Sequence, residues 1–102
     1  MAVLYITEYQ NQAVLFGSRE APIALEPPIT TQTVAIGAGH AESAAFNANT
    51  QLVRLSTDAI CSILFGTGPA AATTSPRMPA DTIEYFAVPR GGSLKVSVIA
   101  NT

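Results

Sequence analysis

Apolar and polar residues alternate most regularly in the second half of this sequence. In residues 93–100, Leu94, Val96 and Val98 occupy every second position, and Ser93, Lys95 and Ser97 stand between them. A period of two places alternate side chains on opposite faces, so this stretch predicts a strand with one buried face. Similar apolar and β-branched runs predict further strands at residues 51–57, 60–65 and 82–88.

The first third of the chain combines one clear strand pattern with a proline-containing segment. Residues 3–9 are rich in β-branched and aromatic residues, which favour a pleated strand. Residues 10–32 contain three prolines, each of which lacks an amide donor and restricts the residue before it. We therefore expect residues 1–32 to form an N-terminal strand and an extended arm. Such an arm either clasps a neighbouring molecule or wraps around its own domain.

The middle of the chain is less regular. Residues 33–38 predict a short strand that ends in a glycine-containing turn. Residues 41–50 are ambiguous, because their alanines favour a helix whereas Asn47 and Asn49 favour a turn. Residues 66–81 contain three prolines and two glycines and predict a long loop. A loop of this length is uncommon in a small domain, so it is either a contact surface or a long connector.

Six or seven short strands separated by turns predict an all-β domain, either a sandwich or a barrel. The chain has 102 residues, which is enough for one domain with its own core. We expect residues 33–102 to form a β-sandwich body. No segment has a sustained apolar period of 3.6, so no amphipathic helix is expected.

Charge is scarce in this sequence. Charged residues make up 12% of the chain, about half of the roughly 25% typical of globular domains. A solitary soluble protein usually carries more surface charge, so we expect partners or further copies of the chain to cover part of this surface. The net charge is −2 and the five cations are scattered, so nucleic-acid binding is not expected. No apolar run reaches the length of a membrane span, and the N-terminus does not read as a signal peptide.

Few residues offer reactive chemistry. The chain has one cysteine and one histidine, which excludes an internal disulfide and a multi-cysteine zinc site. Cys61 lies in an apolar stretch, where a thiol is expected to be buried and inert. His40 follows a glycine-containing turn and is interpreted as a polar turn residue rather than a general base. No phosphate-binding loop, dinucleotide fingerprint or nucleophile elbow is present, so we expect no catalytic residue, no cofactor, no metal and no enzyme activity.

Several short segments, spread over most of the chain, carry a resemblance to known proteins. They are Leu4–Tyr9, Glu26–Ile29, Ser43–Asn47, Val53–Leu55, Ala59–Ser62, Phe65–Gly66, Arg77–Asp81, Glu84–Val88 and Lys95–Ile99. Together they resemble a group of small proteins of tailed bacteriophages and prophages, some of which have an implied role as capsid decoration, or cement, proteins. That resemblance implies a β-sandwich or jelly-roll-like body, often trimeric, on the outer face of an icosahedral shell.

The resemblance leads us to expect a structural protein of the virion, made in the host cytoplasm, that binds the outer surface of a phage head. Its expected partners are the major capsid protein and itself, as a homotrimer. Another virion component, such as a tail, head-fibre or host-surface-binding subunit, is one alternative. A small enzyme is a second alternative, which would need His40 or a pair of carboxylates in a cleft. The expected contact residues are Leu4, Tyr5, Pro27, Pro28, Arg77 and Met78.

Overall fold

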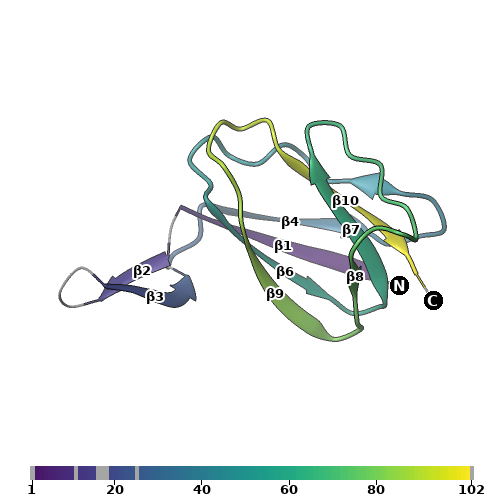
Figure 1. Cartoon of the computed structure of the whole chain (residues 1–102), viewed down its shortest axis with the longest axis horizontal. Coiled ribbons are helices and arrows are strands. Elements are labelled where there is room, and N and C mark those ends of the chain that lie inside the picture. The colour runs from purple at the N-terminus through teal and green to yellow at the C-terminus, as the bar shows by residue number, and fades with distance from the viewer. Residues whose placement is uncertain (1, 11, 16–18, 25, 102) are drawn as a thin grey trace.

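All regular secondary structure in the described residues is β-strand, as the computed structural model of the chain shows (Figure 1). The structure describes residues 2–10, 12–15, 19–24 and 26–101, with side chains for 2–10 and 26–101 only. In chain order the strands are β1 (Val3–Tyr9), β2 (Gln12–Leu15), β3 (Arg19–Ala24), β4 (Thr30–Ala35), β5 (Ala41–Glu42), β6 (Leu52–Thr57), β7 (Cys61–Gly66), β8 (Arg77–Met78), β9 (Thr82–Ala87) and β10 (Lys95–Ala100). The predicted all-β class is confirmed.

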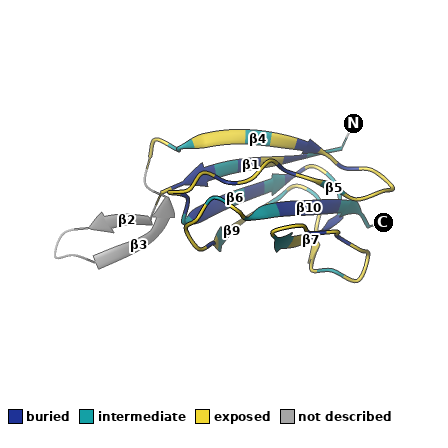
Figure 2. Cartoon of the chain, turned by 90° about the horizontal axis from the view of Figure 1, so that it is seen from above, coloured by how far each residue is buried: buried dark blue, intermediate teal, exposed yellow. Residues whose placement is uncertain are grey.

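Eight of these strands form two antiparallel sheets that face each other. The first sheet has the order β4-β1-β6-β9 and is called the β1 sheet here. The second has the order β5-β10-β7-β8 and is called the β10 sheet. Strands β2 and β3 form a separate two-stranded hairpin. The chain is therefore a two-layer body with one added hairpin (Figures 1 and 2).

Strand β1 lies in the middle of its sheet, between β4 and β6. Leu4 is paired with Val34 on one side and with Thr57 on the other. Leu4 and Ile6 are buried, because the apolar face of β1 packs against the opposite sheet. The strand pairing thus crosses the boundary that the sequence suggested at residue 33, and the N-terminal strand belongs to the two-layer body.

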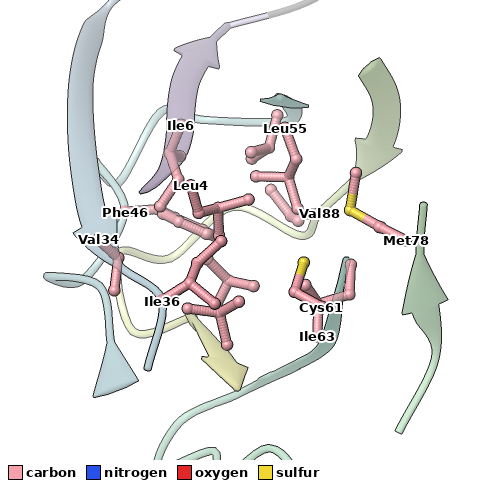
Figure 3. Packing of buried hydrophobic residues seen from close by; sticks show 13 residues of the cluster. Leu4, Ile6, Val34, Ile36, Phe46, Leu55, Cys61, Ile63, Met78 and Val88 are labelled. Carbon is pink, nitrogen blue, oxygen red and sulfur yellow. The ribbon is translucent and has the colours of Figure 1, made fainter. Parts of the chain in front are cut away.

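The hydrophobic core fills the space between the sheets (Figure 3). Its side chains are mostly aliphatic, and aromatic rings connect the two layers. The ring of Phe65 lies 5.2 Å from that of Phe86 and 6.3 Å from that of Phe46, in tilted arrangements that aromatic pairs favour. The buried cluster comprises Leu4, Ile6, Val34, Ile36, Phe46, Val53, Leu55, Cys61, Ile63, Met78, Val88, Val96 and Val98.

The ambiguous segment 41–50 forms the short strand β5 and then a turn. The buried Glu8 carboxylate organises it, since Glu8 Oε1 accepts hydrogen bonds from the Asn47 amide at 2.7 Å and from the Thr50 hydroxyl at 2.9 Å. Glu8 Oε2 accepts a third from Gln32 Nε2 at 3.1 Å. A buried carboxylate is tolerated when its oxygens are bonded in this way. Tertiary hydrogen bonds to Glu8 therefore fix the conformation of this segment, for which local propensity favoured neither a helix nor a turn.

Most predicted strands lie within one or two residues of the observed ones. Strand β4 begins at Thr30, three residues before the predicted start, because it follows the full length of β1. Strand β8 lies inside the predicted loop 66–81, where Met78 is paired with Cys61 of β7. A two-residue strand has too little pattern to be recognised in a sequence.

The β2–β3 hairpin lies beyond one end of the body, and the two chain ends lie at the other (Figure 1). It occupies much of the segment 10–32 that was expected to form an extended arm, and its two strands pair with each other. Residues 26–28, which follow it, belong to no strand, and the Glu26–Pro27 peptide is cis. The Ile29 amide then donates to the Glu8 carbonyl, which returns the chain to β1.

Candidate interaction surface

The outer face of the β10 sheet is largely covered by the chain itself. Ser97 Oγ accepts a hydrogen bond from the Ala71 amide at 3.0 Å. Asn101 Nδ2 donates to Ser62 Oγ at 2.7 Å and to the Thr73 carbonyl at 3.1 Å. Both serines are 0% exposed, although they face away from the core. The long loop after β7 therefore packs against its own sheet, which favours the connector interpretation over a free contact surface.

The outer face of the β1 sheet presents two rows of side chains across its four strands. One row is Thr33, Tyr5, Ser56 and Ile83, and the next is Thr31, Thr7, Arg54 and Tyr85. The alternation along each strand directs these side chains away from the core. We call these eight residues the tyrosine face.

The tyrosine face has apolar side chains that solvent reaches. Tyr5 is 49% exposed, Ile83 51% and Tyr85 50%. The other large apolar side chain that is exposed among the described residues is Leu64, on the outer face of the β10 sheet. Arg54 is the one charged residue of the tyrosine face, Ile83 is aliphatic, and the other six members carry hydroxyl groups. Such a weakly charged surface is suited to a protein contact that buries the aromatic rings and forms hydrogen bonds with the hydroxyl groups.

Tyr9 lies at the end of β1 nearest the hairpin. Its hydroxyl donates to Glu26 Oε2 at 3.0 Å. Burial raises the pKa of the Tyr9 hydroxyl above its usual value, and the hydrogen bond to Glu26 and the charge of that carboxylate raise it further. This contact ties residue 26, where the chain leaves the hairpin, to the body.

The two residues considered for reactive chemistry lie in different environments. His40 is exposed in the connection after β4. Cys61 is fully buried, and burial raises the pKa of its thiol despite a 3.7 Å hydrogen bond to the Thr57 hydroxyl. A thiol with a raised pKa is a poor nucleophile. In the ranges for which side chains are described, no three His, Cys, Asp or Glu residues gather as they would to hold a metal ion.

The expected contact residues do not share one surface. Leu4 and Met78 are core residues, because the inward faces of β1 and β8 carry them, and their side chains are not available to a partner. Tyr5 belongs to the tyrosine face, and Arg77 is exposed beside β7. Pro27 is exposed and Pro28 partly so in the connection that leads back from the hairpin.

Sequence reasoning did not single out Ile83 and Tyr85. The sequence did contain a signal for them. Ile83 and Tyr85 are two residues apart in the predicted strand 82–88, so their side chains are expected on the same face of it. The sequence does not show the register in which this strand pairs with its neighbours. Only the pairing of β9 with β6, and of β6 with β1, brings Ile83 into the row of Tyr5.

Comparison with protein-family models, with curated proteins and with solved structures found no match to this chain. In the described ranges no helix is long and apolar enough to cross a membrane.

Proposed function

We propose that this protein is a capsid decoration protein, which binds the outer surface of a tailed-phage head and stabilises the shell. The observation that carries the proposal is the tyrosine face: an open sheet surface with three half-exposed apolar side chains and a single charge. The resemblance of the sequence to small phage proteins supplies the identity of the partner, the major capsid protein.

The tyrosine face is energetically suited to this role. A tyrosine buries roughly 200 Å² in a contact, so covering the exposed half removes about 100 Å² from water. At about 25 cal/mol per Å² this contributes roughly 2.5 kcal/mol per ring before the entropic cost of association. Few charges are present, so little desolvation opposes the contact.

We also propose that the body is a circularly permuted jelly roll, in which the strand that would come last in the chain, β1, comes first. A jelly roll corresponds to a long antiparallel hairpin wrapped into two sheets. If the chain is followed from β4, the paired strands of such a hairpin can be identified. From its turn to its open end they are β7–β8, β6–β9, β5–β10 and β4–β1. Strand β1 then takes the position of the last strand, and the pairs β1–β6 and β7–β10 are those that wrapping creates.

The position of the chain ends supports this topology. The Ile36 amide donates to the Ala2 carbonyl, and the Ala100 amide donates to the Gly37 carbonyl. The first and last described segments therefore flank the same connection, as Figure 1 also shows. A jelly roll opened between its seventh and eighth strands would have its ends at such a place.

The hairpin β2–β3 serves in this proposal as the arm. It lies beyond the end of the body, where it can reach a neighbouring subunit without disturbing the core (Figure 1). Assembly as a homotrimer would present several hairpins and tyrosine faces at once. Several weak contacts then combine through multivalency, and binding to the mature shell stabilises it by mass action.

The test mixes the purified protein with expanded, undecorated capsids and with unexpanded procapsids, followed by sedimentation and cryo-electron microscopy. We expect saturable binding at symmetry-related sites on the expanded shell and greater resistance of that shell to heat. Replacement of Tyr5 by Ser should weaken binding about tenfold, which corresponds to roughly 1.4 kcal/mol.

The matched control is Leu64→Ser, which removes an exposed apolar side chain from the other sheet and should leave capsid affinity unchanged. Protein that stays in the supernatant with both kinds of particle would refute the proposed function. Equal weakening by the two serine variants would refute the assignment of the contact to the tyrosine face.

A further inference from the structure

The β1 sheet ends in two long strands that each have an open side. Strand β4 forms one edge and β9 the other, and both are six residues long. The edge strands of the β10 sheet, β5 and β8, have two residues each. Figure 2 shows the largely exposed residues of β4 along the rim of the body. Long open edges are sites where another strand can pair, and short ones offer few backbone groups.

The backbone groups that are free on each edge follow from the hydrogen bonds next to it. The Val88 amide donates to the Gln51 carbonyl, and the Ile36 amide donates to the Ala2 carbonyl. Successive residues of an antiparallel strand point their backbone groups to alternate sides. Ile83, Tyr85 and Ala87 therefore direct their N–H and C=O groups away from β6. By the same alternation, Thr31, Thr33 and Ala35 direct their N–H and C=O groups away from β1.

We propose that β9 of one molecule pairs with β4 of a second copy of this chain, which continues the β1 sheet from one molecule into the next. The polarity is correct, because the three antiparallel steps from β4 through β1 and β6 make β9 antiparallel to β4. A second copy in the same orientation places its β4 antiparallel to β9. The side-chain rows then run on across the junction.

The side chains of the two edges complement each other. With the rows continued, Ile83 is opposite Thr33 of the second copy, and Tyr85 is opposite its Thr31. Aromatic or aliphatic residues beside β-branched ones are favourable cross-strand pairs. Glu84 makes pairing of β9 with another β9 unfavourable in the register that places the two Glu84 residues opposite each other, since their carboxylates would then approach. Strand β4 carries no charge, so β9 meets no like charge there.

This pairing joins two different edges, so it is a heterologous contact, which builds a closed ring if the rotation between copies allows and a filament otherwise. The inference rests on the self-association in the proposed function but not on capsid binding. Its test uses the purified chain alone, so that a failure here leaves the capsid experiment standing.

The experiment introduces one cysteine on each of the two edges. Ile83→Cys is mixed with Thr33→Cys, oxidised and run on a non-reducing gel, with one variant tagged to identify mixed dimers. Directly paired residues of this type have Cα atoms about 5.5 Å apart, within disulfide range. Within one molecule the two positions are three strand spacings apart, roughly 14 Å, so they cannot join. The native Cys61 is buried, and its protection from a thiol reagent also reports that each variant is folded.

We expect the mixture to give at least about ten times more disulfide dimer than either variant alone. Thr31→Cys and Ala35→Cys are tested in the same way, and the partner that cross-links fastest with Ile83→Cys identifies the register. Failure of all three partners, or dimers of Ile83→Cys alone in equal yield, would overturn the proposal.

A second measurement separates backbone pairing from side-chain contact. Thr33→Pro removes an amide that points away from β1, whereas Thr33→Ala keeps it. Sedimentation equilibrium should show about tenfold weaker self-association for the proline variant and a much smaller change for the alanine variant. Equal association of both variants, while Cys61 stays protected, would contradict an edge-to-edge contact.

Discussion

The outer faces of the two sheets both carry every second side chain of their strands, but solvent reaches these side chains to different extents. On the β10 sheet, Ser62 and Ser97 are buried beneath the loop that follows β7, and each serine hydroxyl accepts a hydrogen bond. On the β1 sheet, Tyr5 and Tyr85 occupy equivalent outward positions and are half exposed. Ser62 and Ser97 lie where the chain covers itself, and Tyr5 and Tyr85 lie where it does not. The outer face of the β1 sheet is therefore the one that the chain leaves open to solvent.

The largest expected effect comes from placing the same large side chain on each face. Ser97→Leu should destabilise the fold by about 3 kcal/mol, because the new side chain has no room beneath the loop and the Ala71 amide loses its acceptor. Ser56→Leu, on the tyrosine face, should change stability by less than about 0.5 kcal/mol. Urea denaturation followed by circular dichroism measures both. Similar losses for the two variants would show that the faces are equally covered.

Replacement of the same two serines by alanine compares the two faces without adding side-chain volume. Ser97→Ala leaves the Ala71 amide without its acceptor and should cost about 1–2 kcal/mol of unfolding free energy. The matched Ser56→Ala variant should stay within about 0.5 kcal/mol of the parent. Hydrogen exchange offers a second readout, since the Ala71 amide should exchange faster in the first variant only. Unchanged protection of that amide would contradict the covering role of the loop.

The smallest effect is expected at Tyr9, where the β1 sheet meets the end of the hairpin. Burial, more than any other cause, raises the folded-state pKa of its hydroxyl above the usual tyrosine value of 10.0. The unfolded chain therefore loses this proton first, and the stability that the tyrosine contributes is present below pH 10 and declines as pH rises through the raised pKa. Tyr9→Phe should lose about 1 kcal/mol at neutral pH and show a weaker decline in stability above pH 10. An identical alkaline profile in both proteins would refute this assignment.

Much of the β-architecture could be predicted from side-chain patterns. The run from Val3 to Tyr9 coincides with strand β1, and all but the first two residues of the alternating segment 93–100 lie in strand β10. Local patterns also indicated that Cys61 would be buried. The prediction for Ser97 was incomplete, because alternation places it opposite Val96 and Val98 but cannot show that a loop covers that side. The arm at residues 10–32 was inferred from prolines, and its sequence did not indicate that β2 would pair with β3 within it.

The sequence by itself determined the six longer strands of the two-layer body, the scarcity of charge and the small set of reactive side chains, since these depend on composition and on a period of two. Only the tertiary structure decided which outward face is open. Register brings Tyr5, Ile83 and Tyr85 from strands separated by up to 80 residues into adjacent rows, and the loop after β7 covers the opposite sheet. Both outcomes depend on contacts between distant segments, which local propensity does not encode.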